Sequence, residues 1–342
     1  MSDSGKLQRL REFLQGELGR DIGNIELKKF EGGSSNLTYE VFGDNLELIL
    51  RTPPAGNRVK SAHDMKREYD VLTLLATRFE FAPKPLAYCG DDEILGSEFL
   101  VMAKIDGLIL RGDWPFHQSD ADFSRNVLTS FLQTLVELHS IDVAVPDFPK
   151  FGNPVGYSSR QVHGWCDRYR KARTEELPDL EDTLVWLEAR IPADDPPAFV
   201  HNDYKFDNVV FRAADRPEIV GVLDWEMATV GSPLMDLGTT LGYWMSASES
   251  EELLGLPFNP RLLMERYSVA SLAEIYSELS GRNVDSYHYY YIFGTFKIAV
   301  IAQQIYRRYL KGHAKDKRFA AFGRFVEGLG RICVREIGKS NL

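Results

Sequence analysis

The chain has 342 residues, of which 44% are hydrophobic and 26% charged, a composition typical of a globular protein with a sizeable core. Its formal net charge of −10 argues against general nucleic-acid binding, which favours a basic surface. The three widely spaced cysteines predict a reducing compartment and no zinc site. Neither a signal-peptide pattern nor an apolar run of about eighteen residues occurs, so we expect a cytoplasmic protein without membrane or nucleic-acid partners.

The first hundred residues carry mainly strand-like patterns. Leucines at helical spacing between Leu7 and Leu18 predict an opening helix, and KREYDVLTLL predicts a second helix over 62–77. Apolar and β-branched runs bounded by turn residues predict strands. The expected strands are 25–30, 38–42, 46–51, 86–89 and 97–102.

A turn rich in glycine and serine separates the first two of these strands. Small residues at such a tip can expose backbone N–H groups to phosphate oxygens. The same residue types also favour an ordinary hairpin turn, so the pattern alone leaves both interpretations open. The residues of this turn are Gly32, Gly33, Ser34, Ser35 and Asn36.

Helical patterns dominate beyond residue 105. Ser119 is expected to cap a helix, two helical patterns separated by Pro178 occupy 150–198, and further helices are expected near 260–280, 286–311 and 316–336. Strands followed by helices predict an α+β fold with an N-terminal lobe, 1–105, and a helical C-terminal lobe, 106–342. The basic residues within 160–173 predict either a solvated helix face or a patch that attracts an anionic substrate.

The segments FVHNDYKFDNVVF and VGVLDWE carry the candidate chemistry. Asp203 and Asn208 lie in a loop that leads into an apolar strand, and Asp224 lies at the tip of the next strand. We expect these side chains to project into one small volume. Carboxylate and amide oxygens suit Mg²⁺ and a phosphate-bearing substrate.

The spacing of these residues resembles that of the kinases. His201-x-Asp203 followed by Asn208 resembles their catalytic loop, and Asp224 stands where they keep a metal-binding aspartate. Together, HNDYKFDN and LDWEMATVGSPLMDLG resemble the aminoglycoside phosphotransferase-like family, kinase-fold enzymes that act on small molecules. The resemblance extends from residue 20 to residue 337, and the tail YYYIFGTFKIAVIAQQIYRRYLKG resembles the subgroup found fused to acyl-CoA dehydrogenases. It implies a bilobal protein-kinase-like fold that uses ATP, or another nucleoside triphosphate, and Mg²⁺.

The resemblance also implies roles for individual residues of the catalytic segments. Asp203 would orient the substrate hydroxyl, and Lys205 would neutralise the transferring phosphoryl group. Asn208 and Asp224 would hold Mg²⁺. These assignments make Asp203 and Lys205 the predicted catalytic residues.

Residues next to these are expected to support the loop. The resemblance implies that Asp236 is a buried aspartate that anchors the catalytic loop through its backbone. We expect His201 to support the loop by hydrogen bonding rather than by titrating. For Glu226, the sequence leaves open whether it lines the acceptor pocket or helps to arrange the metal.

The resemblance implies nucleotide binding by the N-terminal lobe, and it favours phosphate binding by the turn 32–36. Kinase-fold enzymes usually carry a lysine where this chain has Arg51, and arginine can still bind phosphate bidentately. Glu68 would pair with Arg51, although a surface ion pair of little energetic weight is the alternative. Ala103 and Ile105 would contact adenine through their main chains, with Met102 lining the pocket.

The expected activity is therefore transfer of the γ-phosphate of ATP to a hydroxyl group of a small molecule. A nucleotide-binding scaffold, suggested by Arg51, is one alternative. A protein kinase is another, although the short distance from Asp224 to Gly231 leaves no room for a long activation segment. The acceptor remains open between a hydroxyacyl thioester and an aminoglycoside-like polycation.

A hydrolase with a transition-metal cluster is a further alternative. Its ligands would be His201, Asp203 and Asp207. Oxygen ligands dominate this set, so Mg²⁺ is preferred. A hydrolase would also leave the glycine- and serine-rich turn unexplained.

Overall fold

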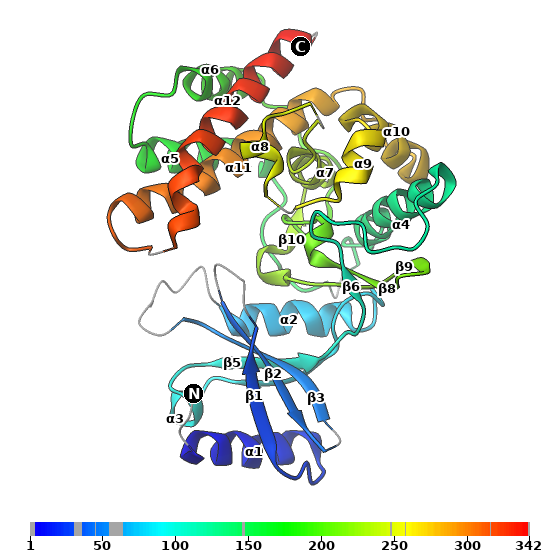
Figure 1. Ribbon diagram of the computed structural model, residues 1–342, viewed down its shortest axis with the longest axis vertical. Helices are drawn as coiled ribbons and strands as arrows, with labels where there is room; N and C mark the ends of the chain where they lie inside the picture. The colour runs from blue at the N-terminus through cyan, green and yellow to red at the C-terminus, as the bar shows by residue number, and fades with distance from the viewer. Residues whose placement is uncertain are drawn as a thin grey trace. The chain divides into compact units, whose positions relative to one another are not determined.

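The computed structural model describes residues 4–30, 36–44, 46–54, 64–145, 148–246, 248–256, 258–314 and 316–340 (Figure 1). The chain divides into two compact units. Unit 1 comprises Met1–Gly107 and Val220–Met227, and unit 2 comprises Leu108–Ile219 and Ala228–Leu342. The division differs from the predicted lobes, 1–105 and 106–342, in that the segment around Asp224 groups with unit 1.

Unit 1 is built around an antiparallel sheet with the strand order β1-β2-β3-β5-β4. The strands and helices expected before residue 105 are present, with ends shifted by a few residues. The elements of unit 1 are α1 (Ser4–Leu18), β1 (Ile25–Lys29), β2 (Leu37–Gly43), β3 (Leu46–Thr52), α2 (Met65–Leu75), β4 (Pro85–Cys89), α3 (Asp92–Leu95), β5 (Phe99–Ala103) and the short 3₁₀ helix η2 (Trp225–Met227).

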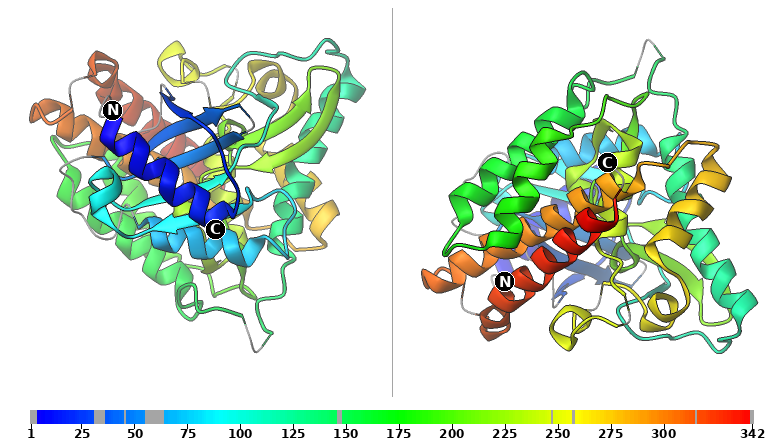
Figure 2. Two further views of the ribbon diagram at one scale, coloured as in Figure 1. Left: turned by 90° about the horizontal axis from the view of Figure 1, so that it is seen from below. Right: turned by 90° about the horizontal axis from the view of Figure 1, so that it is seen from above.

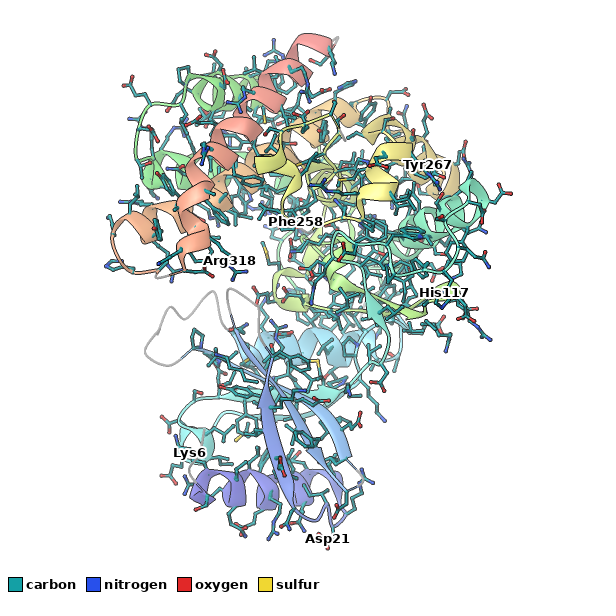
Figure 3. All side chains as sticks on the ribbon, viewed as in Figure 1. Lys6, Asp21, His117, Phe258, Tyr267 and Arg318 are labelled. Atoms are coloured by element: carbon teal, nitrogen blue, oxygen red, sulfur yellow. The ribbon has the colours of Figure 1, made fainter. Side chains whose placement is uncertain are left out.

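The sheet of unit 1 is covered by helices on opposite faces, α1 on one and α2 on the other (Figure 1). Leu10 and Leu14 of α1 are fully buried against a cluster that includes Val41 and Val101. Because side chains alternate along a strand, successive residues of β5 point to opposite faces of the sheet. Lys6, labelled in Figure 3, donates from Nζ to the carbonyl oxygen of Leu95 (3.3 Å) and so ties α1 to α3.

Unit 2 is mainly helical, so the predicted α+β fold, with strands concentrated before helices, is confirmed. It also holds the small sheets β6-β8-β9 and β7-β10. The elements are β6 (Leu108–Ile109), α4 (Ala121–His139), α5 (Tyr157–Ala172), α6 (Pro178–Ala189), β7 (Ala198–Val200), η1 (Phe206–Asn208), β8 (Val209–Ala213), β9 (Arg216–Val222, whose end lies in unit 1), β10 (Thr229–Gly231), α7 (Pro233–Gly242), α8 (Glu251–Leu254), α9 (Arg261–Arg266), α10 (Val269–Ser280), α11 (Tyr287–Leu310), η3 (Lys317–Ala321) and α12 (Phe322–Lys339).

The expected cap of α4 was wrong by one residue. Asp120, not Ser119, precedes the helix, and its Oδ1 accepts a hydrogen bond from the backbone N–H of Phe123 (2.9 Å). An aspartate at this position satisfies a free N–H and places negative charge at the positive end of the helix. No helix in the described part of the chain is long and apolar enough to cross a membrane.

Helices α7 and α11 form the centre of unit 2, and α12 lies along α11 with α5 and α6 beside them (Figure 2). The crossing of α7 and α11 depends on glycine. A Cβ atom at Gly294 would lie 1.8 Å from the carbonyl oxygen of Gly238, and one at Gly238 would lie 2.3 Å from that of Tyr290. The backbones therefore approach too closely for any side chain at these positions.

Replacing Gly294 with alanine should lower the free energy of unfolding by about 2 kcal/mol or more, because a backbone rather than a flexible side chain blocks the new methyl group. Thermal unfolding would measure the change. Gly338→Ala is the matched control, since a Cβ at Gly338 in α12 meets nothing within 4 Å. An unchanged midpoint for Gly294→Ala would show that α7 and α11 do not pack this closely in solution.

Candidate active site

A buried aspartate anchors the loop 201–208 of unit 2, the predicted catalytic loop. The Oδ2 atom of Asp236 accepts the backbone N–H of His201 (2.7 Å), and its Oδ1 accepts that of Asn202 (2.7 Å). Asp236 lies in the first turn of α7 and is fully buried. Burial alone would raise the pKa of Asp236, but the hydrogen bonds from the ring of His139 and from the backbone N–H of His201 lower it. The predicted anchoring through the backbone is confirmed.

Histidines on both sides of this anchor act through hydrogen bonds. The backbone N–H of Asp203 donates to Nδ1 of His201 (3.2 Å), which places the ring proton of His201 on Nε2. His139 holds Asp236 from the other side (Nε2 to Oδ2, 3.1 Å) and is itself held by the hydroxyl of Tyr276 (2.8 Å). His201 thus supports the loop, as the sequence predicted.

The carboxylate of Asp203 is held at both oxygens. Its Oδ2 accepts from Nζ of Lys205 (2.6 Å) and Nδ2 of Asn208 (3.0 Å), and its Oδ1 accepts from the hydroxyl of Tyr243 (2.7 Å). Burial would raise the pKa of Asp203, but Lys205 and the hydrogen bonds lower it below the ordinary value. Asp203 is therefore a carboxylate at neutral pH, with a fixed direction.

Tyr243 is a residue of the site that no sequence motif predicted. It lies at the end of α7, and its ring packs on Phe258, labelled in Figure 3, with the ring centres 4.9 Å apart. Nζ of Lys205 lies 5.0 Å from the centre of the Tyr243 ring, close enough for a cation–π contact. Apolar rings thus border Asp203 and Lys205 and limit their contact with water.

Unit 1 holds a second cluster of charges around Arg51. Its Nη1 pairs with Glu68, and its Nη2 bonds to Asp224 (2.9 Å) and Glu226 (3.3 Å). Glu68 is 1% exposed and Arg51 is 9% exposed, so this is a buried pair and not a surface ion pair. Burial would lower the pKa of Arg51, but the surrounding carboxylates raise it and keep the guanidinium charged.

Glu226 connects this cluster to the segment that follows the glycine- and serine-rich turn. Its Oε2 accepts from Nδ2 of Asn36 (2.8 Å), and its backbone oxygen accepts from Nη1 of Arg67 (2.9 Å). Gly32, Gly33, Ser34 and Ser35 lie outside the described residues. The role of the turn in binding phosphate stays a prediction.

The predicted adenine-binding segment follows β5. Met102 is buried, and the backbone N–H of Ala103 donates to the carbonyl oxygen of Lys84 (2.9 Å). A contact from Ala103 to adenine would therefore have to use its carbonyl oxygen. Ile105 packs against Gly221, where an added Cβ would lie 2.6 Å from Cδ1 of Ile105.

Two of the basic residues in the segment 160–173 are paired with carboxylates. Arg170 bonds to Glu188 (2.8 Å) and Arg173 to Glu181 (2.9 Å). Arg168 stacks on Trp165, with 4.6 Å from Cζ to the ring centre. These contacts fit a solvated helix face better than a patch that attracts an anionic substrate.

The predicted Mg²⁺ ligands offer the oxygen atoms that this ion prefers. The Nδ2 of Asn208 donates to both the backbone oxygen and Oδ2 of Asp203, so its Oδ1 is the atom left for a metal. Asp224 adopts a positive φ of 68°, a conformation that aspartate tolerates and that often marks functional sites. In unit 1, the carboxylates of Asp224 and Glu226 converge on Nη2 of Arg51, at 2.9 and 3.3 Å, and the negative charge of this pair favours a cation beside Asp224.

The alternative transition-metal cluster finds no support. Asp207 pairs with Arg111 (2.5 Å), and Nδ1 of His201 accepts the backbone N–H of Asp203. Within the described ranges, no group of histidine, cysteine, aspartate and glutamate side chains could hold a metal ion. The predicted Mg²⁺ ligands are of another kind, because one of them, Asn208, offers an amide oxygen. A carboxylate and an amide oxygen are compatible with Mg²⁺.

A loop of the form His-x-Asp with a following asparagine, on a fold with a β-rich unit and a helical unit, defines a phosphotransferase of the kinase-like class. The model of the phosphotransferase enzyme family matches residues 26–261, and the chain belongs to this family. The class of enzyme predicted from the sequence, a phosphotransferase acting on a hydroxyl group, is thereby confirmed.

The similar proteins agree with this assignment. Acyl-CoA dehydrogenase family member 11 of Gallus gallus is 31% identical over 332 residues, covering 96% of this chain and 42% of that protein. The chain spans less than half the length of the acyl-CoA dehydrogenase family members that it matches. The predicted resemblance to a kinase-like domain found fused to acyl-CoA dehydrogenases is confirmed.

Solved structures share the fold. A protein from Ralstonia eutropha described as a putative aminoglycoside phosphotransferase superposes with a TM-score of 0.78 at 24% identity, covering 98% of this chain and 99% of that one. Aminoglycoside phosphotransferase APH(4)-Ia, solved with AMP-PNP and hygromycin B, superposes with a TM-score of 0.62 at 14% identity, covering 97% and 99%. The predicted kinase-like fold is confirmed.

Proposed function

We propose that the chain is an ATP-dependent kinase that transfers the γ-phosphate to a hydroxyl group of a small molecule. The observation that carries this proposal is the fixed carboxylate of Asp203, held by Lys205 and Asn208 at Oδ2 and by Tyr243 at Oδ1. A carboxylate oxygen accepts more than one hydrogen bond, so Oδ1 has room for an acceptor hydroxyl beside Tyr243.

In the proposed reaction, the acceptor O–H donates to Oδ1 of Asp203 while the acceptor oxygen bonds to the γ-phosphorus. The bond from this phosphorus to the bridging oxygen of ADP breaks, and the acceptor proton passes to Asp203 and then to solvent. Because the transition state is loose, positioning and charge neutralisation supply most of the acceleration. Lys205, next to Asp203, would offset the charge on the transferring phosphoryl oxygens.

We propose that unit 1 binds the nucleotide. Among the described residues, the buried Nε–H of Arg51 has no hydrogen-bond partner, and a buried unpaired donor is suited to a phosphate oxygen. Glu68 would hold Arg51 in position. The remaining proposed contacts are the turn Gly32, Gly33, Ser34, Ser35 and Asn36 for phosphate, and Met102, Ala103 and Ile105 for adenine.

We propose Asn208 and Asp224 as the protein ligands of Mg²⁺, from their oxygen atoms and their positions in the family motif. When bound, the ion would neutralise and orient the triphosphate oxygens. The convergence of the Asp224 and Glu226 carboxylates on one nitrogen of Arg51 supports Asp224 as a ligand, and the orientation of the Asn208 amide supports Asn208 as a ligand.

For the acceptor, we propose a hydroxyacyl thioester. The names of the relatives that match most of the chain support this choice, since those proteins are named as acyl-CoA dehydrogenase family members. The name of the Ralstonia eutropha neighbour instead supports an aminoglycoside-like compound as the second candidate. The paired arginines of α5 add no weight to either.

The test measures the formation of ADP from ATP in the presence of candidate acceptors, with and without Mg²⁺. The candidate acceptors are hydroxyacyl-CoAs, aminoglycosides and amino alcohols. We expect turnover with a hydroxyacyl-CoA that stops when EDTA removes the metal and that yields a phosphorylated product by mass spectrometry. Turnover of an aminoglycoside alone would reject the acyl acceptor but keep the kinase. ATP binding without transfer to any acceptor would favour the scaffold, and labelling of proteins alone would favour a protein kinase.

A further inference from the structure

Lys297 is a buried lysine in the middle of the apolar helix α11. It is 3% exposed, and its neighbours along the chain are aromatic and aliphatic. A buried ammonium group is costly unless hydrogen bonds compensate for the lost water. Nζ of Lys297 donates to the backbone oxygen of Asn202 (2.7 Å) and to Oγ1 of Thr239 (3.2 Å), and it lies 5.5 Å from the centre of the Trp165 ring.

The hydrogen bond from Lys297 to Asn202 restrains the peptide group that joins Asn202 to Asp203. The oxygen of this peptide bonds to Lys297, and its N–H donates to Nδ1 of His201 (3.2 Å). Because a peptide group is planar, partners at both ends define the orientation of the plane from which Asp203 continues. Asn202 has a positive φ of 67°, an uncommon conformation that asparagine tolerates better than most residues.

Other contacts hold the same residue in this conformation. The hydroxyl of Tyr157 donates to Oδ1 of Asn202 (2.9 Å), and Oδ1 of Asp236 accepts the Asn202 N–H (2.7 Å). The close approach of α7 and α11 at Gly294, one turn before Lys297, brings the lysine within reach of Thr239. The close packing of α7 and α11 at their glycines thus positions Lys297 for its hydrogen bond to Asn202 in the loop.

We propose that Lys297 is a positioning residue of the catalytic loop, whose ammonium group holds the carbonyl of Asn202 and thereby sets the direction of the Asp203 carboxylate. Lys297 reaches the loop from the protein interior and need not touch the substrate. The effect on phosphoryl transfer rests on the proposed function, whereas the restraint on the loop does not.

The charge of Lys297 depends on groups from several elements. The pKa of Lys297 is lowered to about 8, chiefly by burial and to a smaller extent by Lys205 in the loop and Arg168 in α5. Asp203 in the loop and Asp236 in α7 act in the opposite direction and raise it. The ammonium form therefore predominates at neutral pH and is lost as the pH rises through about 8. A neutral amine donates a weaker hydrogen bond to the carbonyl of Asn202.

Amide hydrogen exchange in Lys297→Met tests the restraint without any substrate. Methionine keeps the length of the side chain but removes the donor and the charge, so exchange of the Asp203 amide should accelerate about tenfold or more. Lys171→Met, which removes an exposed lysine of α5, is the matched control and should leave this exchange unchanged. A folded Lys297→Met with unchanged exchange at Asn202 and Asp203 overturns the proposal.

A measurement on the unmodified protein keeps the proposal testable if Lys297→Met does not fold. The carbonyl ¹³C shift of Asn202 should titrate with a midpoint near 8, because the donor to this carbonyl loses its charge. Lys297→Arg, which stays charged, should show no such titration. A carbonyl shift in the unmodified protein that stays constant while the Nζ of Lys297, followed by its ¹⁵N shift, loses its proton overturns the proposal.

Transfer kinetics then test positioning. With an acceptor that is turned over, Lys297→Met should lower kcat about 10- to 100-fold and leave KM for ATP within about twofold. A loosened loop with unchanged kcat would show that Lys297 is merely structural. If the loop loosens but the unmodified protein transfers phosphate to no acceptor, the proposed function fails while the restraint by Lys297 stands.

Discussion

Asp203→Asn is expected to lower kcat for phosphoryl transfer by about 10²- to 10⁴-fold. The amide keeps the size of the carboxylate but removes its charge, and it turns one acceptor oxygen into a donor that faces either Tyr243 or the pair Lys205 and Asn208. The acceptor hydroxyl would lose its oriented partner. Steady-state kinetics with a turned-over acceptor, together with the Kd for ATP, would measure the effect.

The residues proposed to contact the phosphates and adenine directly belong to unit 1, so the affinity for ATP measured without Mg²⁺ should change by less than about threefold in this variant. Asp207→Asn is the matched control from the same loop, because Asp207 pairs with Arg111 and contacts none of the groups around Asp203 described above. We expect the control to retain most of its kcat. Equal kcat values for Asp203→Asn and the unmodified protein would exclude Asp203 as the group that orients the acceptor.

The parts of the site that follow a spacing rule could be predicted from the sequence. The fixed number of residues from His201 to Asn208 is needed because one short loop has to bring the carboxylate of Asp203 and the amide of Asn208 together. The pairing of Arg51 with Glu68 and the anchoring by Asp236 followed from the same resemblance and are present. Metal and nucleotide binding by these residues stays a prediction.

The contacts that depend on packing could not be predicted. Tyr243 and Lys297 reach the catalytic loop from α7 and α11, and only the crossing of these helices places them there. The lone lysine in an apolar helix was a signal, since such a charge requires buried partners. Helix α7 was not predicted because its glycines and threonines disfavour helix formation, whereas the close packing against α11 requires glycine at Gly238 and Gly242.

The second large effect is expected at Asp236, which determines the conformation of the loop. Asp236→Asn should lower the free energy of unfolding by about 3–5 kcal/mol, because the buried carboxylate accepts hydrogen bonds at both oxygens. An asparagine amide would turn one of those acceptors into a donor facing an N–H group of His139, His201 or Asn202. Urea unfolding monitored by circular dichroism would measure the loss.

The same substitution has a defined pH dependence. The pKa of Asp236 is lower in the folded chain than in the unfolded chain, so the folded state favours the charged form. Its contribution to stability is complete above the ordinary aspartate pKa and is lost as the pH falls through the folded value. The difference in free energy of unfolding between Asp236→Asn and the unmodified protein should therefore become smaller in acid.

Asp182→Asn is the control, since Asp182 lies at an exposed position of α6. It should change the free energy of unfolding by less than about 0.5 kcal/mol at any of these pH values. A difference for Asp236→Asn that stays constant down to the lowest pH at which the protein folds would mean that the charge of Asp236 is not what anchors the loop.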